Sequence, residues 1–158
     1  MSLLTPDYIF DTIYDVDLKM LKKEGIKLLL IDIDNTIIPW DSSLVDKKLK
    51  RLFQKMKDEG FLVRILSNAP NERVKAISEE LNVKGIGRSL KPLSLNFKKS
   101  IKDEGILKEQ TAMIGDQIFT DLLGAKLAGI KSILVTPLSE KELKATRFMR
   151  LLERLVRK

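Results

Sequence analysis

Two aspartates lie two positions apart at the end of an apolar run near the start of the chain. They are Asp32 and Asp34, in the sequence LLLIDID at positions 28–34. Side chains at positions i and i+2 of a strand point to the same side, so these two carboxylates would converge on one spot. Two acids held together cost free energy unless a cation or a substrate uses them, which makes the pair a candidate site.

Further polar residues follow later apolar runs and could complete a site. They are Ser67, Asn68, Lys91, Asp116 and Asp121. Asp32 and Asp116, with Asp121 as an additional candidate, offer the hard oxygen ligands that Mg²⁺ prefers. A bound metal would offset the repulsion between a carboxylate nucleophile and a phosphate dianion.

The same set of residues suits the other requirements of phosphoryl transfer. Lys91 and the Ser67 hydroxyl could stabilise the equatorial oxygens as charge spreads over them. Asp34 would then be free to protonate the leaving oxygen. Structural roles remain open as well, because Ser67 and Asn68 could cap the following helix and Asp121 could serve only the first turn of its own helix.

Composition limits what else the chain can do. It has 158 residues, 44% of them hydrophobic, which predicts one compact domain over 1–158. It contains no cysteine and no histidine, so thiolate sites and the commonest general base are both excluded. Proton transfer must therefore use carboxylates, lysines, tyrosines or water. The formal net charge of +7 favours anionic partners.

Strand and helix patterns alternate along most of the chain. The predicted strands cover 27–33, 61–66, 83–86, 111–114 and 131–135, and the predicted helices cover 43–60, 70–81, 93–104 and 119–128. We predict a helical lead-in over 1–26, which includes a helix at 17–24, and a basic amphipathic helix over 139–158. The alternation predicts an α/β fold of three Rossmann-like layers, with a mostly parallel sheet of about five strands and helices on both faces.

A sheet of this class binds ligands beyond the carboxyl ends of its strands. Asp32 follows the first predicted strand, Ser67 the second, Lys91 the third and Asp116 the fourth. Four separate segments would thus deliver polar side chains to one edge, which chance placement would rarely do.

These segments also resemble the four sequence blocks of the haloacid-dehalogenase-like (HAD) phosphatases, in the usual order. The matching pieces are Asp32-Ile33-Asp34-Asn35-Thr36, Ser67-Asn68, Lys91-Pro92 and Gly115-Asp116-Gln117-Ile118-Phe119-Thr120-Asp121. The resemblance implies a strand order of 3-2-1-4-5 and an Asp32 nucleophile that forms an aspartyl-phosphate. Asp34 would act first as acid and then as base.

The family resemblance also implies a ligand set. The main-chain carbonyl of Asp34 would bind Mg²⁺ alongside Asp32 and Asp116, while Ser67, Asn68 and Lys91 would bind the phosphate. An acid at position 34 favours a phosphatase or phosphomutase. The gaps in which HAD enzymes carry caps hold only one helix and its loops here, so we predict a capless enzyme of subfamily III. An open site would admit a phosphate on a large surface.

The whole-chain pattern is similar to the YqeG-type branch, which resembles the phosphatidylglycerophosphate phosphatases. The supporting pieces span 5–137 and include Thr5-Pro6-Asp7-Tyr8, Trp40, Ser67-Asn68-Ala69 and Gly115-Asp116-Gln117. This resemblance implies removal of the terminal phosphate from phosphatidylglycerophosphate, an anionic phospholipid.

The predicted helix over 139–158 bears on that substrate because its apolar and basic residues segregate. It could lie on an anionic membrane, or its apolar side could pack on the sheet with the basic side in water. No apolar stretch approaches the roughly 20 residues that cross a bilayer, and the amino terminus lacks a secretory signal. We therefore expect a cytoplasmic protein, peripheral on the inner membrane face if this helix meets lipid.

Three functions from different classes remain open at this stage. The first is a Mg²⁺-dependent lipid phosphatase, and the second is a HAD phosphatase acting on a soluble sugar phosphate, nucleotide or phosphoprotein. The third is a binding module that keeps the fold without turnover. Nucleic-acid binding ranks last, because the basic residues show no recognised binding motif and no regular aromatic interleaving.

Overall fold

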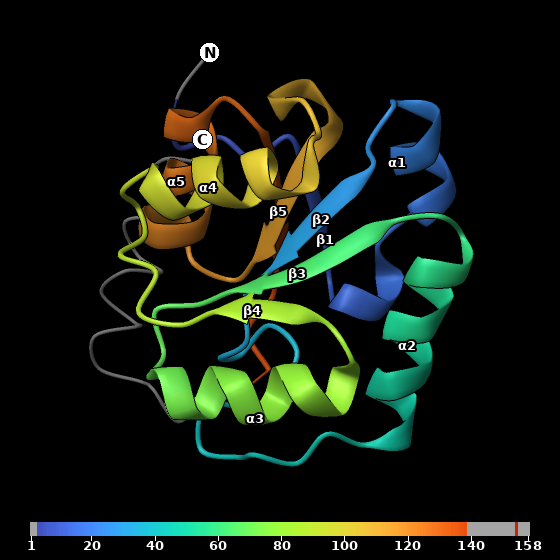
Figure 1. Ribbon diagram of the computed structural model, residues 1–158. Helices are drawn as coiled ribbons and strands as arrows, with labels where there is room; N and C mark the ends of the chain where they lie inside the picture. Colours follow the sequence, from blue (N-terminus) through green and yellow to red (C-terminus); the bar gives the residue numbers. More distant parts are fainter. Residues whose placement is uncertain (1–2, 139–153, 155–158) are drawn as a thin grey trace.

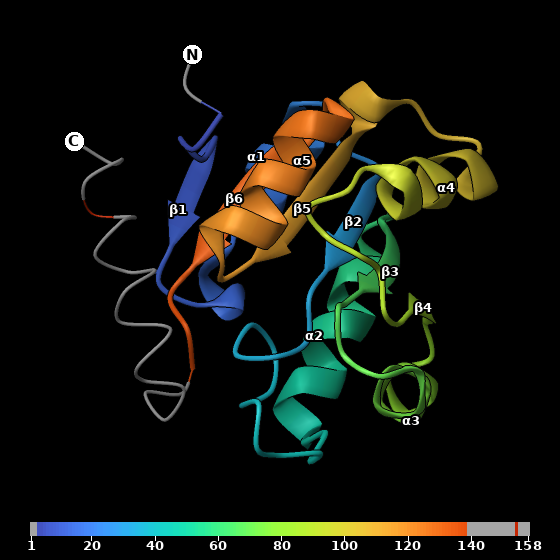
Figure 2. The ribbon, with the colours of Figure 1, turned by 90° about the vertical axis from the view of Figure 1, so that its left-hand side faces the viewer.

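Six parallel strands form one sheet in the computed structural model, which describes residues 3–138 and 154 (Figure 1). The strands are β1 (Tyr8–Phe10), β2 (Leu28–Ile31), β3 (Leu62–Leu66), β4 (Lys84–Ile86), β5 (Thr111–Gly115) and β6 (Lys131–Val135). Their order is β1-β6-β5-β2-β3-β4, as Figure 2 shows from one side of the sheet to the other. The five predicted strands, β2 to β6, keep the predicted order 3-2-1-4-5, and β1 adds an edge strand beside β6.

Helices cover both faces of this sheet, as predicted. They are α1 (Leu18–Lys23), α2 (Lys47–Asp58), α3 (Asn71–Leu81), α4 (Leu95–Glu104) and α5 (Leu123–Ala128). Figures 1 and 2 place α1, α2 and α3 on one face and α4 and α5 on the other. Among the described residues, no helix is long and apolar enough to cross a membrane. The predicted helix over 139–158 lies outside the described residues, apart from residue 154.

The central strand β2 explains why two helical layers are needed. All four of its residues are apolar and fully buried, and their side chains alternate between the two faces. Leu29 and Ile31 pack in the core beneath α1, α2 and α3, whereas Leu28 and Leu30 pack in the core beneath α4 and α5. A strand buried on both faces reads as a continuous apolar run, which is the pattern that predicted it.

Two predicted helix boundaries are wrong. Helix α2 begins at Lys47 and not at 43, because the Asp46 carboxylate accepts the Leu49 N–H at 2.8 Å and so caps the helix itself. The predicted helix over 119–128 is a wider π-helical turn over Ile118–Leu122 followed by α5. Wider turns of this kind recur at functional sites.

The helical lead-in over 1–26 is also wrong in part, because Tyr8–Phe10 forms strand β1. Tertiary contacts hold this strand in place. The Asp7 carboxylate accepts hydrogen bonds from the Ser132 N–H at 2.8 Å and the Ser132 hydroxyl at 3.1 Å, and it pairs with Lys126 at 3.0 Å. Ser132 and Lys126 are far along the chain, so local sequence does not signal these contacts.

We expect Asp7→Asn to destabilise the protein by about 1 to 2 kcal/mol at pH 7, because it removes a charged acceptor of two hydrogen bonds. Burial raises the pKa of Asp7, but Ser132 and Lys126 outweigh it and hold the pKa below its ordinary value of 3.8. The stabilisation is therefore present above pH 3.8 and is lost as the pH falls through the folded-state pKa. Urea unfolding of both proteins at pH 7 and pH 3 measures this, with Asp11→Asn as an exposed control. An equal gap at both pH values would contradict it.

Candidate active site

The register of the parallel strands places the predicted site residues at one edge. Ile31 at the end of β2 pairs with Ile65 of β3 and with Ile114 of β5, so these three strands end together. Asp32 follows β2 directly, Ser67 follows β3 and Asp116 follows β5. The site therefore lies beyond the carboxyl ends of the central strands, where ligands bind in open parallel sheets.

Three carboxylates from two of these segments form a buried cluster. One oxygen from each of Asp32, Asp116 and Asp121 lies within 4.8 Å of the others. The three residues are only 7%, 1% and 2% exposed. Burying like charges this close is unfavourable without a compensating cation, with a cost on the order of several kcal/mol per ion.

Lys91 supplies part of that compensation. Its ammonium lies 2.5 Å from Asp121 Oδ1 and 3.1 Å from Asp32 Oδ1, and its side chain is almost completely buried. Burial alone would lower the pKa of Lys91, but the charges of Asp121 and Asp32 raise it above the ordinary lysine value. Lys91 is therefore charged, and its single positive charge offsets only part of the negative charge of the three carboxylates.

Gly115 and the π-helical turn set the position of Asp121. A Cβ atom on Gly115 would lie 2.2 Å from Asp121 Oδ2, so no larger residue fits there unless the carboxylate moves. The same oxygen accepts the Gln117 N–H at 3.2 Å. Burial and the Asp32 charge raise the pKa of Asp121, against the Lys91 ammonium, which lowers it.

Asp34 lies at the mouth of the site and has a partner that the sequence did not suggest. Arg73 of α3 approaches Asp34 Oδ1 with Nε at 3.0 Å and with Nη2 at 2.9 Å. Burial raises the pKa of Asp34, although Arg73 opposes the shift. The Nη1 group of Arg73 also donates to the Ser42 carbonyl at 2.6 Å, so one side chain ties Asp34 to the loop that follows it.

Arg73 was missed because its segment reads as an ordinary helix. The residue stands three positions after Pro70, and its charge resembles that of the many exposed basic side chains. The available signal was its place in the first turn of a helix that begins at the active edge of the sheet.

Ser67 and Asn68 lie in the site with different tasks. The Ser67 hydroxyl accepts the Ala69 N–H at 3.1 Å and borders the cavity, so it combines a local turn with a place near the reacting group. The Asn68 side chain donates to the Lys91 carbonyl at 3.1 Å and accepts the Lys91 N–H at 2.9 Å. Its amide thus braces the main chain of the loop that carries Lys91.

A cavity of about 190 Å³ opens onto this cluster. It is lined by Asp32, Asp34, Ser67, Asn68, Ala69, Lys91, Gln117 and Thr120. Sites for drug-sized molecules usually measure about 300 to 1,000 Å³. This cavity is closer to the volume of a phosphoryl group with a few waters, each of which takes about 30 Å³.

The residues present fit a divalent cation. Carboxylate oxygens are the ligands that hard divalent cations take, and three of them converge here. Lys91 lies closer to Asp121, at 2.5 Å, than to Asp32, at 3.1 Å. A buried carboxylate cluster beside a phosphate-sized cavity is the arrangement that a metal-dependent hydrolase of phosphate esters requires.

Comparison with known families agrees with this class. Residues 5–129 match the haloacid dehalogenase-like hydrolase family. The chain belongs to this family, and the predicted family and enzyme class are confirmed.

Two curated relatives make the comparison more specific. The chain is 34% identical to a probable phosphatase, YqeG, of Bacillus subtilis over 96% of its own length and 88% of that protein. It is 25% identical to phosphatidylglycerophosphate phosphatase 1, chloroplastic/mitochondrial, of Arabidopsis thaliana, over 80% of this chain and 39% of that relative.

Solved structures support the fold. An uncharacterised protein from Listeria monocytogenes serotype 4b aligns with a TM-score of 0.59 at 20% identity, over 75% of this chain and 85% of that one. The deoxy-D-mannose-octulosonate 8-phosphate phosphatase of Haemophilus influenzae aligns with a TM-score of 0.56 at 19% identity, over 72% of this chain and 70% of that one.

We expect the protein to bind one divalent cation and Asp116→Asn to lower its affinity at least about ten-fold, because the amide removes a negative charge and a ligand. Calorimetric titration with Mg²⁺ and Mn²⁺ measures the change. Asp11→Asn keeps the same substitution on an exposed carboxylate outside the cluster and should leave the affinity unchanged. Equal affinity in the Asp116→Asn and wild-type proteins would place the metal elsewhere.

Proposed function

We propose that this protein is a Mg²⁺-dependent phosphomonoester hydrolase that removes the terminal phosphate of phosphatidylglycerophosphate, leaving phosphatidylglycerol. The observation that carries the hydrolase part is the buried cluster of three carboxylates and Lys91 beside a phosphate-sized cavity. The similarity to the Arabidopsis phosphatase over 80% of this chain supports the lipid substrate.

The open edge of the sheet supports a large substrate. Between β2 and α2 the described chain forms only a loop, and between β3 and β4 it forms only α3, so no cap encloses the cavity in this part of the chain. A cavity of about 190 Å³ holds a phosphate while the rest of the substrate stays outside. A phospholipid presents its headgroup in that manner.

The first chemical step transfers the phosphoryl group to Asp32. A carboxylate oxygen of Asp32 forms a bond to phosphorus as the bond from phosphorus to the ester oxygen breaks. Asp34, whose pKa is raised by burial, gives its proton to the departing alkoxide. The products are the free alcohol and an aspartyl-phosphate on Asp32.

The second step releases phosphate and restores the enzyme. The Asp34 carboxylate takes a proton from a water molecule, whose oxygen bonds to phosphorus as the bond to the Asp32 oxygen breaks. Inorganic phosphate leaves, and Asp34 is again protonated for the next substrate. One carboxylate therefore serves as acid and then as base, in a chain that has no histidine for either role.

The remaining residues stabilise charge and geometry in both steps. Mg²⁺ held by Asp32, Asp116 and the Asp34 carbonyl would offset the repulsion between a carboxylate and a phosphate dianion. Lys91 presents its ammonium and Ser67 its hydroxyl to the equatorial oxygens. Asp121 uses both oxygens on Lys91 and Gln117, so we assign it to holding Lys91.

Arg73 should affect substrates according to their leaving group. We expect Arg73→Met to lower kcat/KM at least about ten-fold more for an alkyl phosphate than for p-nitrophenyl phosphate. The aryl group leaves without a proton, whereas an alkoxide needs the acid that Arg73 positions, and general acid catalysis contributes about 10²- to 10⁴-fold. Arg51→Met, an exposed arginine on α2, is the control. An equal loss of kcat/KM on both esters would show that Arg73 does not position Asp34 as the acid.

Substrate choice is tested by phosphate release with and without Mg²⁺. We expect strong, metal-dependent activity on phosphatidylglycerophosphate in mixed micelles and at least about ten-fold lower kcat/KM on a panel of sugar phosphates, nucleotides and phosphopeptides, because the cavity encloses only the phosphate. The Asp32→Asn protein is the blank and should be inactive. Preference for a soluble ester would overturn the lipid substrate, and activity in Asp32→Asn would overturn the nucleophile.

A further inference from the structure

Three exposed leucines border the loop that carries Lys91. Leu90, Leu93 and Leu95 are 58%, 61% and 68% exposed, whereas Lys91 is buried. The Leu93 N–H donates to the Leu90 carbonyl at 2.9 Å, so the segment makes a tight turn with Lys91 inside and leucines outside. Leu90 is held at a φ of 61°, a left-handed conformation that a leucine rarely adopts. The turn thus presents apolar side chains to water at the edge of the active site.

Helix α4 extends this apolar edge with basic residues. Leu95, Lys98, Lys99 and Lys102 are spaced i, i+3, i+4 and i+7, so they share one side of the helix. All four are exposed, while Phe97 on the opposite side is fully buried. The outward side of α4 is therefore apolar where it meets the active site and positively charged beyond it.

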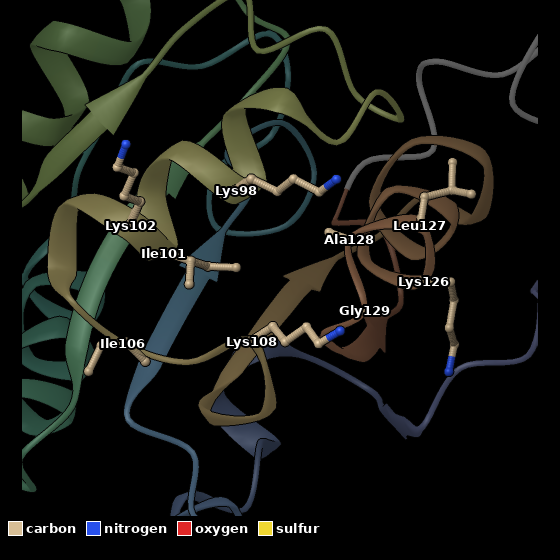
Figure 3. A pocket seen from close by; sticks show the side chains of 9 residues that line it. All are labelled: Lys98, Ile101, Lys102, Ile106, Lys108, Lys126, Leu127, Ala128 and Gly129. Carbon is tan, nitrogen blue, oxygen red and sulfur yellow. The ribbon is translucent and has the colours of Figure 1, made fainter.

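A basic pocket of about 460 Å³ continues this charge between α4 and α5. Its lining combines apolar residues with four lysines and contains no acidic residue; the lysines are Lys98, Lys102, Lys108 and Lys126. Figure 3 shows Lys98 and Lys108 extending toward the α5 side of the pocket. Lys126 is paired with Asp7, and Lys99 lies 3.8 Å from Asp103. Within the described part of the chain, Lys98, Lys102 and Lys108 form no ion pair.

We propose that this α4 surface, made of Leu90, Leu93, Leu95, Lys98, Lys102 and Lys108, docks on an anionic phospholipid bilayer. The lysines attract anionic headgroups, and the leucines enter the interfacial region beside the cavity. This docking surface would bring the protein to the lipid substrate of the proposed function. It rests on that function only for the statement that the bound lipid is also the substrate.

The combination of side chains favours a bilayer over other polyanions. Single-stranded nucleic acids are bound by aromatic side chains that stack on bases, and the α4 surface has leucines in their place. Leucine gains free energy on leaving water for the interface, and lysine gains it near anionic lipid. Because Leu90 and Leu93 adjoin Lys91, docking would bring a headgroup phosphate to the mouth of the cavity.

Vesicle co-sedimentation tests the surface without catalysis. The full chain is mixed with vesicles of phosphatidylcholine alone or with 30% phosphatidylglycerol, a composition of about one anionic lipid in three chosen to give a strong surface potential. We expect binding to the anionic vesicles only, and weaker binding as salt rises. Lys98→Glu with Lys102→Glu should lower the partition coefficient at least about 25-fold, since each lysine contributes about five-fold.

Matched variants separate this surface from general charge and hydrophobicity. Arg51→Glu with Lys55→Glu makes the same charge change at the same spacing on α2 and should retain most of the binding that the α4 variant loses. Leu93→Gln with Leu95→Gln should lower binding at least about ten-fold. Ile9→Gln with Leu62→Gln, at exposed positions of β1 and β3, should bind within about two-fold of wild type.

The outcomes distinguish this proposal from the catalytic one. The four surface double variants should hydrolyse p-nitrophenyl phosphate at the wild-type rate, and the inactive Asp32→Asn protein should bind vesicles like wild type. Loss of binding confined to the α4 variants supports the proposal even if phosphatidylglycerophosphate is not hydrolysed. The proposal is overturned if the wild-type protein does not bind anionic vesicles. It is also overturned if the α4 variants and their controls bind alike, as they would if another segment made the contact.

Discussion

The close approach of three buried carboxylates is the constraint on which the rest of this structure depends. Asp32, Asp116 and Asp121 place oxygens within 4.8 Å of one another, where like charges repel strongly. The positive charge of Lys91 offsets part of that repulsion, and a divalent cation would offset the remainder. Two neighbouring residues support this arrangement. The Asn68 side chain braces the loop that carries Lys91, and the absence of a side chain at Gly115 leaves room for Asp121.

The apolar layers give this charged cluster its rigidity. Strand β2 is buried on both faces, and its neighbours β3 and β5 end at the same level. Close-packed interiors resist small displacements, so the carboxylates in the segments that follow β2 and β5 cannot move apart freely to relieve their repulsion. The free energy that burial of the core supplies is thus what allows an electrostatically unfavourable site to persist, ready for a cation and a phosphate.

The small cavity divides the work of catalysis from that of substrate selection. The cluster and Lys91 meet only the phosphate, which all phosphate esters share, and so cannot by themselves select a substrate. Selection must depend on the surface around the mouth, where Arg73 ties a loop to Asp34 and where the leucines beside Lys91 are exposed. In an enzyme without an enclosing cap, a bilayer can cover the side of the active site that a cap would otherwise cover. The proposed substrate and the proposed docking surface are linked in this way.

Local sequence patterns were enough to predict five of the six strands and the segments that carry most of the site. Apolar runs marked β2 to β6, and the residue types after them marked Asp32, Asp34, Ser67, Lys91 and Asp116. The roles of residues whose partners are distant in sequence became evident only from the folded chain. Strand β1 depends on Ser132 and Lys126, and Arg73 acts on Asp34 across 39 positions. Local periodicity carries no information about such contacts, since they exist only once the parallel strands have brought their ends together.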